Sequence, residues 1–134
     1  MVGSRRREAP FNPAEMLSGA LDAFRLSPGE VLFREGEQGE LMYVVLEGRV
    51  DILVGDSVVE TANEGGIVGE MTLIDDAPRA ASVIANTGCR LVGIDRKRFH
   101  LLVESNPAFS THVMKILANR LRHMNQLYLA SLKR

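Results

Sequence analysis

One stretch of the sequence, GEMTLIDDAPRAAS at residues 69–82, contains residue types that suit an anion site. Gly69 has no Cβ, so a ligand can approach the backbone closely there. If the chain forms a short helix from Glu70 onward, the free N–H groups at its start can donate to an anion. Arg79 adds a guanidinium, which can bind two oxygens of one phosphate at once. These features predict a site for a phosphate-bearing ligand.

Glu70 needs a different partner, because a carboxylate repels a phosphate. Beside an anion site it is suited to accept hydrogen bonds from the hydroxyl groups of a sugar. The small side chains of Ala80 and Ala81 leave room for a flat group. The stretch therefore fits a ligand with a phosphate and a vicinal hydroxyl. Taken alone, it also fits a surface ion pair between Glu70 and Arg79, which is the more common arrangement and contributes little stability.

The chain has 134 residues, 46% of them hydrophobic and 25% charged, which is typical of one soluble globular domain. Its formal net charge of −1 gives no general attraction to nucleic acid or to membranes. The single cysteine, Cys89, excludes an internal disulfide and a multi-thiolate metal site, and suits a reducing compartment. No apolar run approaches the roughly 18 residues of a membrane-spanning helix. We expect a cytoplasmic protein with a disordered tail at residues 1–10 and a single domain at residues 11–134.

Short runs rich in β-forming residues occupy the chain from about residue 26 to 96, with glycines between them or at their ends. The runs are VLF, LMYVVL, RVDILV, SVVET, ASVIA and RLVGID. Val50, Ile52 and Val54 alternate with polar Asp51 and small Gly55, which is the period of a half-buried strand. Gly-Asp-Ser at residues 55–57 predicts a tight hairpin turn. Many short strands at this spacing predict a mainly β fold with flanking helices, an antiparallel jelly-roll (double-stranded β-helix) barrel.

Helix signals flank this β-rich region. Asn12 can cap a helix whose first residue is a proline, and we expect a short helix over residues 13–20. After the strands, Asp95 can cap the first of two C-terminal helices. Asn106 precedes the proline that starts the second. The C-terminal helices should span about residues 96–133.

The last helix carries apolar residues at alternating spacings of three and four, which predict a packing seam. These residues are Met114, Leu117, Leu121, Met124 and Tyr128. Over the first half of the helix, this seam fits packing on the barrel and packing in a dimer about equally well. Beyond Leu121 the sequence favours a homodimer, because the apolar end of the helix needs a cover.

Residues 68–81 resemble the phosphate-binding cassette of the cyclic nucleotide-binding domain, found in the catabolite activator protein and in the regulatory subunits of cyclic-AMP-dependent kinase. The family cassette has Phe-Gly-Glu-Leu-Ala-Leu, a few variable residues and then Pro-Arg-Ala-Ala. This sequence has Val-Gly-Glu-Met-Thr-Leu, Ile-Asp-Asp-Ala and Pro-Arg-Ala-Ala without a gap. Residues 28–36 (PGEVLFREG) and 45–50 (VLEGRV) resemble the family's first strands and its glycine-marked turn. The resemblance covers nearly everything from about residue 20 onward.

The resemblance implies a role for each cassette residue. Arg79 would neutralise the cyclic phosphate, and Glu70 would accept a hydrogen bond from the ribose 2′-hydroxyl. The N–H groups near the phosphate would be those of Gly69, Glu70, Met71, Thr72 and Ala80, with Ala81 beside them. In the family, a threonine directly after the arginine goes with cyclic GMP in the kinase that binds it, so Ala80 favours cyclic AMP. The expected ligand is cyclic AMP, with cyclic GMP as the alternative, and no cofactor, metal or catalytic residue is implied.

The sequence departs from the family pattern at several positions. Thr72 replaces a small residue, and its hydroxyl can either bind the phosphate or crowd the site. Asp75 and Asp76 bring negative charge close to an anion site, which weakens binding only if they point inward. In the terminal helix, Met124 aligns with a threonine that contacts adenine in the catabolite activator protein. Asn125 aligns with the neighbouring serine, which reaches across the dimer, so both residues are candidates for base contact.

The resemblance implies a regulatory receptor and not an enzyme. Ligand binding would pull the cassette inward and move the helices from Asn106 onward, which would alter a homodimer or an effector protein that the sequence does not identify. Direct DNA binding is not expected, because the sequence ends at Arg134 before any helix-turn-helix domain.

Two alternatives compete with this interpretation. A degenerate domain could keep the fold and dimerise or dock proteins without nucleotide, although the intact Glu70 and Arg79 argue against it. A metal-binding cupin enzyme would need histidines that converge from strands. The three histidines, His100, His112 and His123, all fall in predicted helices.

Overall fold

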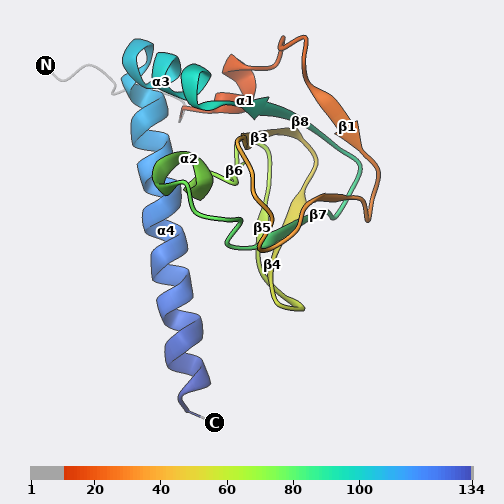
Figure 1. Cartoon of the computed structure of the whole chain (residues 1–134), viewed down its shortest axis with the longest axis vertical. Coiled ribbons are helices and arrows are strands. Elements are labelled where there is room, and N and C mark those ends of the chain that lie inside the picture. Colours follow the sequence, from red (N-terminus) through yellow and green to blue (C-terminus); the bar gives the residue numbers. More distant parts are fainter. Residues whose placement is uncertain (1–10, 134) are drawn as a thin grey trace, which may run out of the picture.

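The computed structural model describes residues 11–133, and within them the chain forms eight strands and four helices. The predicted tail at residues 1–10 lies outside the described residues. The strands are β1 (Phe24–Leu26), β2 (Val31–Phe33), β3 (Met42–Glu47), β4 (Val50–Val54), β5 (Ser57–Ala62), β6 (Ile67–Val68), β7 (Ser82–Ala85) and β8 (Cys89–Ile94). The helices are α1 (Pro13–Met16), α2 (Met71–Asp75), α3 (Arg96–Ser105) and α4 (Pro107–Ser131). Figure 1 shows the long α4 running alongside the strands.

The strands form two antiparallel four-stranded sheets, which confirms the predicted mainly β jelly-roll fold with flanking helices. One sheet has the strand order β1-β8-β3-β6 and the other has β2-β7-β4-β5. The two sheets are hydrogen-bonded separately, so the predicted barrel is an open pair of sheets.

Strand β3 borders two hydrophobic cores because both of its faces are buried. Met42, Val44 and Leu46 belong to a core shared with the helices, whereas Val45 belongs to a second core. This second core takes its residues from both sheets. Successive side chains of a strand point to opposite faces. Burial on both faces therefore explains why LMYVVL is a continuous apolar run.

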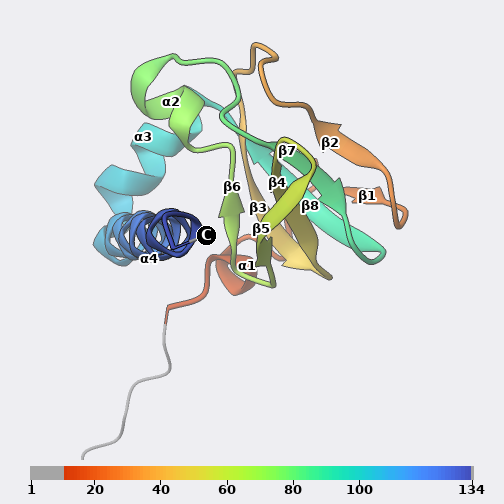
Figure 2. The ribbon, with the colours of Figure 1, turned by 90° about the horizontal axis from the view of Figure 1, so that it is seen from below.

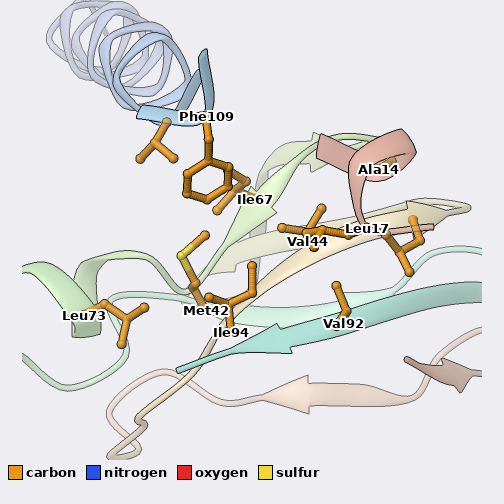
Figure 3. Close-up of a cluster of buried hydrophobic side chains, with 11 residues drawn as sticks. Ala14, Leu17, Met42, Val44, Ile67, Leu73, Val92, Ile94 and Phe109 are labelled. Atoms are coloured by element: carbon orange, nitrogen blue, oxygen red, sulfur yellow. The ribbon is translucent and has the colours of Figure 1, made fainter. Parts of the chain in front are cut away.

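The core under the helices ties α2 and α4 to the first sheet. Phe109, in the first turn of α4, is fully buried and shares a cluster with Leu73 of α2, Met42 of β3 and Ile94 of β8 (Figure 3). Full burial of a side chain of this kind contributes about 1.5–3 kcal/mol. The start of α4 is thus fixed close to α2.

Side-chain caps begin α1 and α3 as predicted. Asn12 Oδ1 accepts a hydrogen bond of 2.9 Å from the Ala14 N–H, and Asp95 Oδ1 accepts one of 2.8 Å from the Arg98 N–H. The predicted end of the first helix was wrong, since α1 ends at Met16 and turns follow it. The next residues include a Ser-Gly pair, which favours turns over helix.

The predicted hairpin joins β4 and β5. Val54 pairs with Ser57, which leaves Gly55 and Asp56 as a two-residue turn. Gly55 has a φ of +60°, a conformation that glycine adopts without steric cost. Strands β1, of three residues, and β6, of two, were not among the predicted runs.

Helix α4 is 25 residues long, and its C-terminal turns project beyond the sheets (Figure 1). The residues of the predicted seam differ in burial. Leu117 and Met124 are partly buried, whereas Met114 and Tyr128 are 59% and 64% exposed. Between residues 11 and 133, no helix has both the length and the apolar character needed to cross a membrane.

Candidate functional site

A pocket of about 530 Å³ lies between α2, α4 and the strands that face them. This volume is in the range of small-molecule sites, roughly 300–1,000 Å³. The predicted site residues that line it are Gly69, Glu70, Met71, Thr72, Arg79, Ala80, Ala81 and Met124. Seen along α4 in Figure 2, α2, α3 and α4 lie on the same side of the sheets. The structure therefore brings the cassette and the last helix together at one cavity.

Arg79 is buried beside this pocket, with 5% of its surface exposed. Its Nη1 donates hydrogen bonds of 3.2 Å to the Gly69 carbonyl and to Thr72 Oγ1. Its guanidinium carbon lies 4.1 Å from the centre of the Phe33 ring, a cation–π contact. Burial lowers the pKa of Arg79, and the nearby Tyr43 partly offsets this shift. The Nε–H is buried against Gly39 without a hydrogen-bond partner in the described part of the chain, so protein acceptors leave part of the guanidinium's donor capacity unused.

Close packing by glycines fixes the position of this guanidinium. A Cβ at Gly39 would collide with it, and a Cβ at Gly69 would lie against its Nη1. Gly69 also has a φ of +77°, which favours glycine for a second reason. The backbone of Arg79 is held as well, because its N–H donates to the Glu37 carbonyl and its carbonyl accepts from the Gly36 N–H, both at 2.8 Å.

Thr72 orients Arg79, a role that its sequence position did not predict. The side chain is 3% exposed, and Oγ1 donates a hydrogen bond of 3.0 Å to the Gly69 carbonyl. The same oxygen accepts from Arg79 Nη1. Because a hydroxyl has one proton, this arrangement leaves none for a ligand. The Thr72 hydroxyl, the Gly69 carbonyl and Arg79 Nη1 are thus hydrogen-bonded to one another.

Glu70 is 4% exposed and forms an ion pair with an arginine of α4. Arg120 Nη1 donates to Glu70 Oε1 at 2.6 Å. Arg120 also binds both carboxylate oxygens of Glu60, in β5, at 2.9 Å, and it donates to the Ile67 carbonyl at 2.6 Å. Burial alone would lower the pKa of Arg120, but the hydrogen bonds with Glu60 and the charge of Glu70 outweigh it and raise the pKa. Glu70 uses Oε1 for this ion pair, so Oε2 can accept from a ligand hydroxyl.

The two aspartates of the cassette have partners other than Arg79, and neither lines this pocket. Asp75 Oδ1 accepts from the Ala77 N–H at 3.0 Å, and Asp76 forms an ion pair with Arg96 of α3. Both aspartates are exposed, so water screens their charge. Their effect on an anion in the pocket is therefore small.

The two candidates for base contact differ in position. Met124 lines the pocket from α4, whereas Asn125 is exposed and is not among the lining residues. Adjacent residues of a helix point about 100° apart, which explains why only one of them faces the pocket. The placement of Asn125 at the pocket of its own chain is thus not supported.

Two histidines of α4 help to attach this helix to the sheets. His112 Nε2 lies 2.9 Å from the Gly65 carbonyl, and His123 Nε2 lies 2.7 Å from the Val59 carbonyl. A carbonyl only accepts, so both ring nitrogens donate. The remaining histidine, His100, lies in α3, and the prediction that all three fall in helices is confirmed.

Several residues of this site were missed from the sequence. Phe33 and Gly39 pack against the guanidinium of Arg79. Arg120 binds Glu70, and Glu60 binds Arg120. A signal was available for Arg120, which has helical spacing with the inward-facing Leu117 and Met124. An arginine in an inward stripe predicts a buried acidic partner.

The family model of the cyclic nucleotide-binding domain matches residues 23–106, which is more than half of the chain. The chain belongs to the cyclic nucleotide-binding domain family. The matched residues of this cyclic nucleotide-binding domain include the whole cassette, and α4 follows directly after them.

Relatives of known type agree with this assignment. A cAMP-dependent protein kinase regulatory subunit from Hypocrea atroviridis is 33% identical over 87 residues, which are 65% of this chain and 19% of that protein. The domain thus spans about a fifth of this relative. The complex of Sp-2Cl-cAMPS with PKAR CBD2 is 27% identical with a TM-score of 0.67, covering 78% of this chain and 70% of that one. The Thermus thermophilus catabolite activator protein is 27% identical with a TM-score of 0.68, covering 81% and 54%.

Proposed function

We propose that this domain is a receptor, and not an enzyme, that binds cyclic AMP in the pocket between α2 and α4. The observation that carries the proposal is the pairing of a buried guanidinium with spare donor capacity, Arg79, and a buried carboxylate, Glu70, along one cavity. A cyclic nucleotide has both complements, a phosphate and a ribose hydroxyl. The relatives support this ligand, since similar structures contain Sp-2Cl-cAMPS and cAMP.

Arg79 would bind the cyclic phosphate, and Glu70 Oε2 would accept from the ribose 2′-hydroxyl. The first helical bonds of α2 run from the N–H groups of Leu73 and Ile74 to the Glu70 carbonyl. The amides of Met71 and Thr72 precede these donors, so they can donate to the ligand. Further contacts would come from the Gly69 and Glu70 amides and from Ala80 and Ala81, which line the pocket.

The phosphate should approach Arg79 from the α4 side. On its other side, Arg79 lines a hollow of about 660 Å³ together with Glu37, Glu40 and Asp76. Glu37 and Glu40 form no ion pair within residues 11–133, so their charges repel an anion there, whereas Asp76 is paired with Arg96. The α4 side has one carboxylate, Glu70, which is already paired with Arg120.

Arg120 would transmit binding from the pocket to α4. It holds α4 against Glu70, Glu60 and the Ile67 carbonyl through four hydrogen bonds. A ribose hydroxyl that shares Glu70 with Arg120 alters this attachment, so ligand-free and ligand-bound domains would differ in how α4 docks. The ligand can shift that equilibrium only by its difference in affinity for the two arrangements.

The exposed end of α4 would pair two copies of the chain or bind an effector protein. The exposed apolar residues there are Leu121, Leu127, Tyr128 and Leu129 of α4 and Leu132 directly after it. An apolar surface of this kind on a projecting helix marks a protein contact. We place the receptor in the cytoplasm, where the free thiol of Cys89 is stable.

Replacing Tyr128 and Leu132 together by glutamate is expected to convert a homodimer to a monomer. Four carboxylates, two from each copy, would lie at the proposed contact and repel one another. Sedimentation equilibrium of the full chain measures the mass directly. Lys115→Glu, at an exposed polar position of α4, is the matched control and should leave the mass at two chains. A wild-type mass of one chain would exclude the homodimer.

Isothermal titration calorimetry with cyclic AMP and cyclic GMP tests the proposed ligand. Heat that fits one site per chain supports the receptor function. A Kd of about 1 mM corresponds to a standard binding free energy of about −4 kcal/mol. If neither nucleotide binds at that concentration, a degenerate domain that docks proteins without nucleotide is the better account.

A further inference from the structure

Asp76, the residue that ends α2, has an unusual backbone conformation. Its φ is +57°, and among residues 11–133 it is the one residue other than glycine with a positive φ. A residue with a Cβ meets steric resistance in this conformation, although aspartate adopts it more readily than most. Such a conformation persists only where the surrounding structure holds it. Contacts outside the turn must therefore keep Asp76 in place.

Arg96, the first residue of α3, supplies these contacts. Its Nη2 forms an ion pair with the Asp76 carboxylate, and its Nη1 donates a hydrogen bond of 3.0 Å to the Leu73 carbonyl. The last carbonyls of a helix have no partner within it, so the second bond caps the C-terminal end of α2. A helix of five residues is not stable by itself. One guanidinium thus holds both the end of α2 and the turn that follows.

The turn leads directly to Arg79. Only Ala77 and Pro78 separate Asp76 from Arg79, and the proline ring fixes the φ of Pro78. At the far end of this short segment, the Arg79 N–H donates to the Glu37 carbonyl at 2.8 Å. The segment is held at both ends, so the position of Asp76 limits where Arg79 can lie.

We propose that Arg96 is a positioning residue, which acts through Asp76 to hold Arg79 at the phosphate end of the pocket. This inference rests on the proposed cyclic nucleotide function. Arg96 is not among the residues that line the pocket, so it acts without touching the ligand there. Its ion pair is partly exposed, and such a pair contributes little by itself. The added bond to the Leu73 carbonyl gives the contact its hold on α2.

Arg96→Met and Arg98→Met separate this role from a general effect of charge. Both arginines lie in the first turn of α3 and form partly exposed ion pairs, but Arg98 pairs with Asp22, outside the cassette. In the ligand-free full chain, the ¹H–¹⁵N NMR signal of the buried Arg79 Nε–H reports the position of the guanidinium. Arg96→Met is expected to shift this signal and to raise its exchange rate with water at least about threefold. An unchanged signal in Arg96→Met, or the same change in Arg98→Met, overturns the inference.

Calorimetry with cyclic AMP tests the consequence for binding. Arg96→Met should raise Kd at least about threefold, and Arg98→Met should change it less than about 1.5-fold. A smaller loss for Arg96→Met overturns the inference. If the wild type binds no cyclic AMP, the receptor function fails, and the Arg79 signal still decides whether Arg96 positions Arg79.

Two variants of Asp76 separate the ion pair from backbone strain. Asp76→Gly and Asp76→Ala both remove the carboxylate, but glycine adopts a positive φ without steric cost. Asp76→Ala should therefore have the lower midpoint in urea denaturation, whereas both variants should raise Kd for cyclic AMP at least about threefold. If Asp76→Gly binds as tightly as the wild type, the contact with Arg96 does not position Arg79.

Discussion

Arg79→Ala is expected to weaken cyclic AMP binding by about 2–5 kcal/mol, because it leaves a buried phosphate without its charge partner. The guanidinium is held by Phe33, Gly39 and Thr72 before any ligand arrives. Because the site is preorganised in this way, little ordering cost remains at the moment of binding. Calorimetry on the wild type and the variant gives the difference directly.

Two further variants separate loss of binding from loss of fold. Arg79→Met keeps a long apolar stem that can pack on Phe33, and the free domain should remain folded in urea denaturation. Arg25→Ala is the control for charge, since Arg25 is an exposed residue of β1 that pairs with Glu47 on the surface. It should change affinity by less than about 0.5 kcal/mol. A loss below about 1 kcal/mol for Arg79→Ala would place the phosphate elsewhere.

Arg120→Met should destabilise the domain by about 3–5 kcal/mol, because the buried Glu70 and the partly buried Glu60 would both lose their cation. The side chains of Arg120, Glu60 and Glu70 are 15%, 25% and 5% exposed, so water screens this ion pair network only in part. The change in free energy of unfolding is measured by urea denaturation. Arg122→Met is the matched control, since Arg122 is exposed on α4 and bonds to Asn119 of the same helix.

A double-mutant cycle identifies the origin of this effect. Adding Glu60→Gln to Arg120→Met removes one of the two uncompensated charges, and the double variant should recover part of the lost stability. A loss below about 1 kcal/mol for Arg120→Met would show that α4 is held by its apolar contacts, such as Phe109, and not by the ion pairs.

The parts of the fold that depend on neighbouring residues could be predicted from the sequence. The caps at Asn12 and Asp95 and the turn at Gly55 each depend on local chemistry, and the structure has all three. The end of α1 was wrong because helix endings depend on weak preferences. The double burial of β3 explains why its run was apolar without alternation.

The parts of the site that depend on distant segments could not be predicted in this way. Glu60 and Glu70 are 60 and 50 positions from Arg120, and no local pattern pairs them. Gly39 looked like one turn glycine among many, and only the fold places the guanidinium of Arg79 against it. Thr72 looked like a residue that could crowd the phosphate, yet its hydroxyl orients Arg79.

The central claim is that the pocket bordered by Glu70 and Arg79 binds a cyclic nucleotide. A calorimetric titration of the full chain with cyclic AMP tests it most directly, with 5′-AMP as the control that has the same base and an open phosphate. The account predicts one site per chain with Kd of about 1–100 μM or tighter, and at least about tenfold weaker binding of 5′-AMP. No heat from cyclic AMP at about 1 mM, or equal binding of both nucleotides, would contradict it.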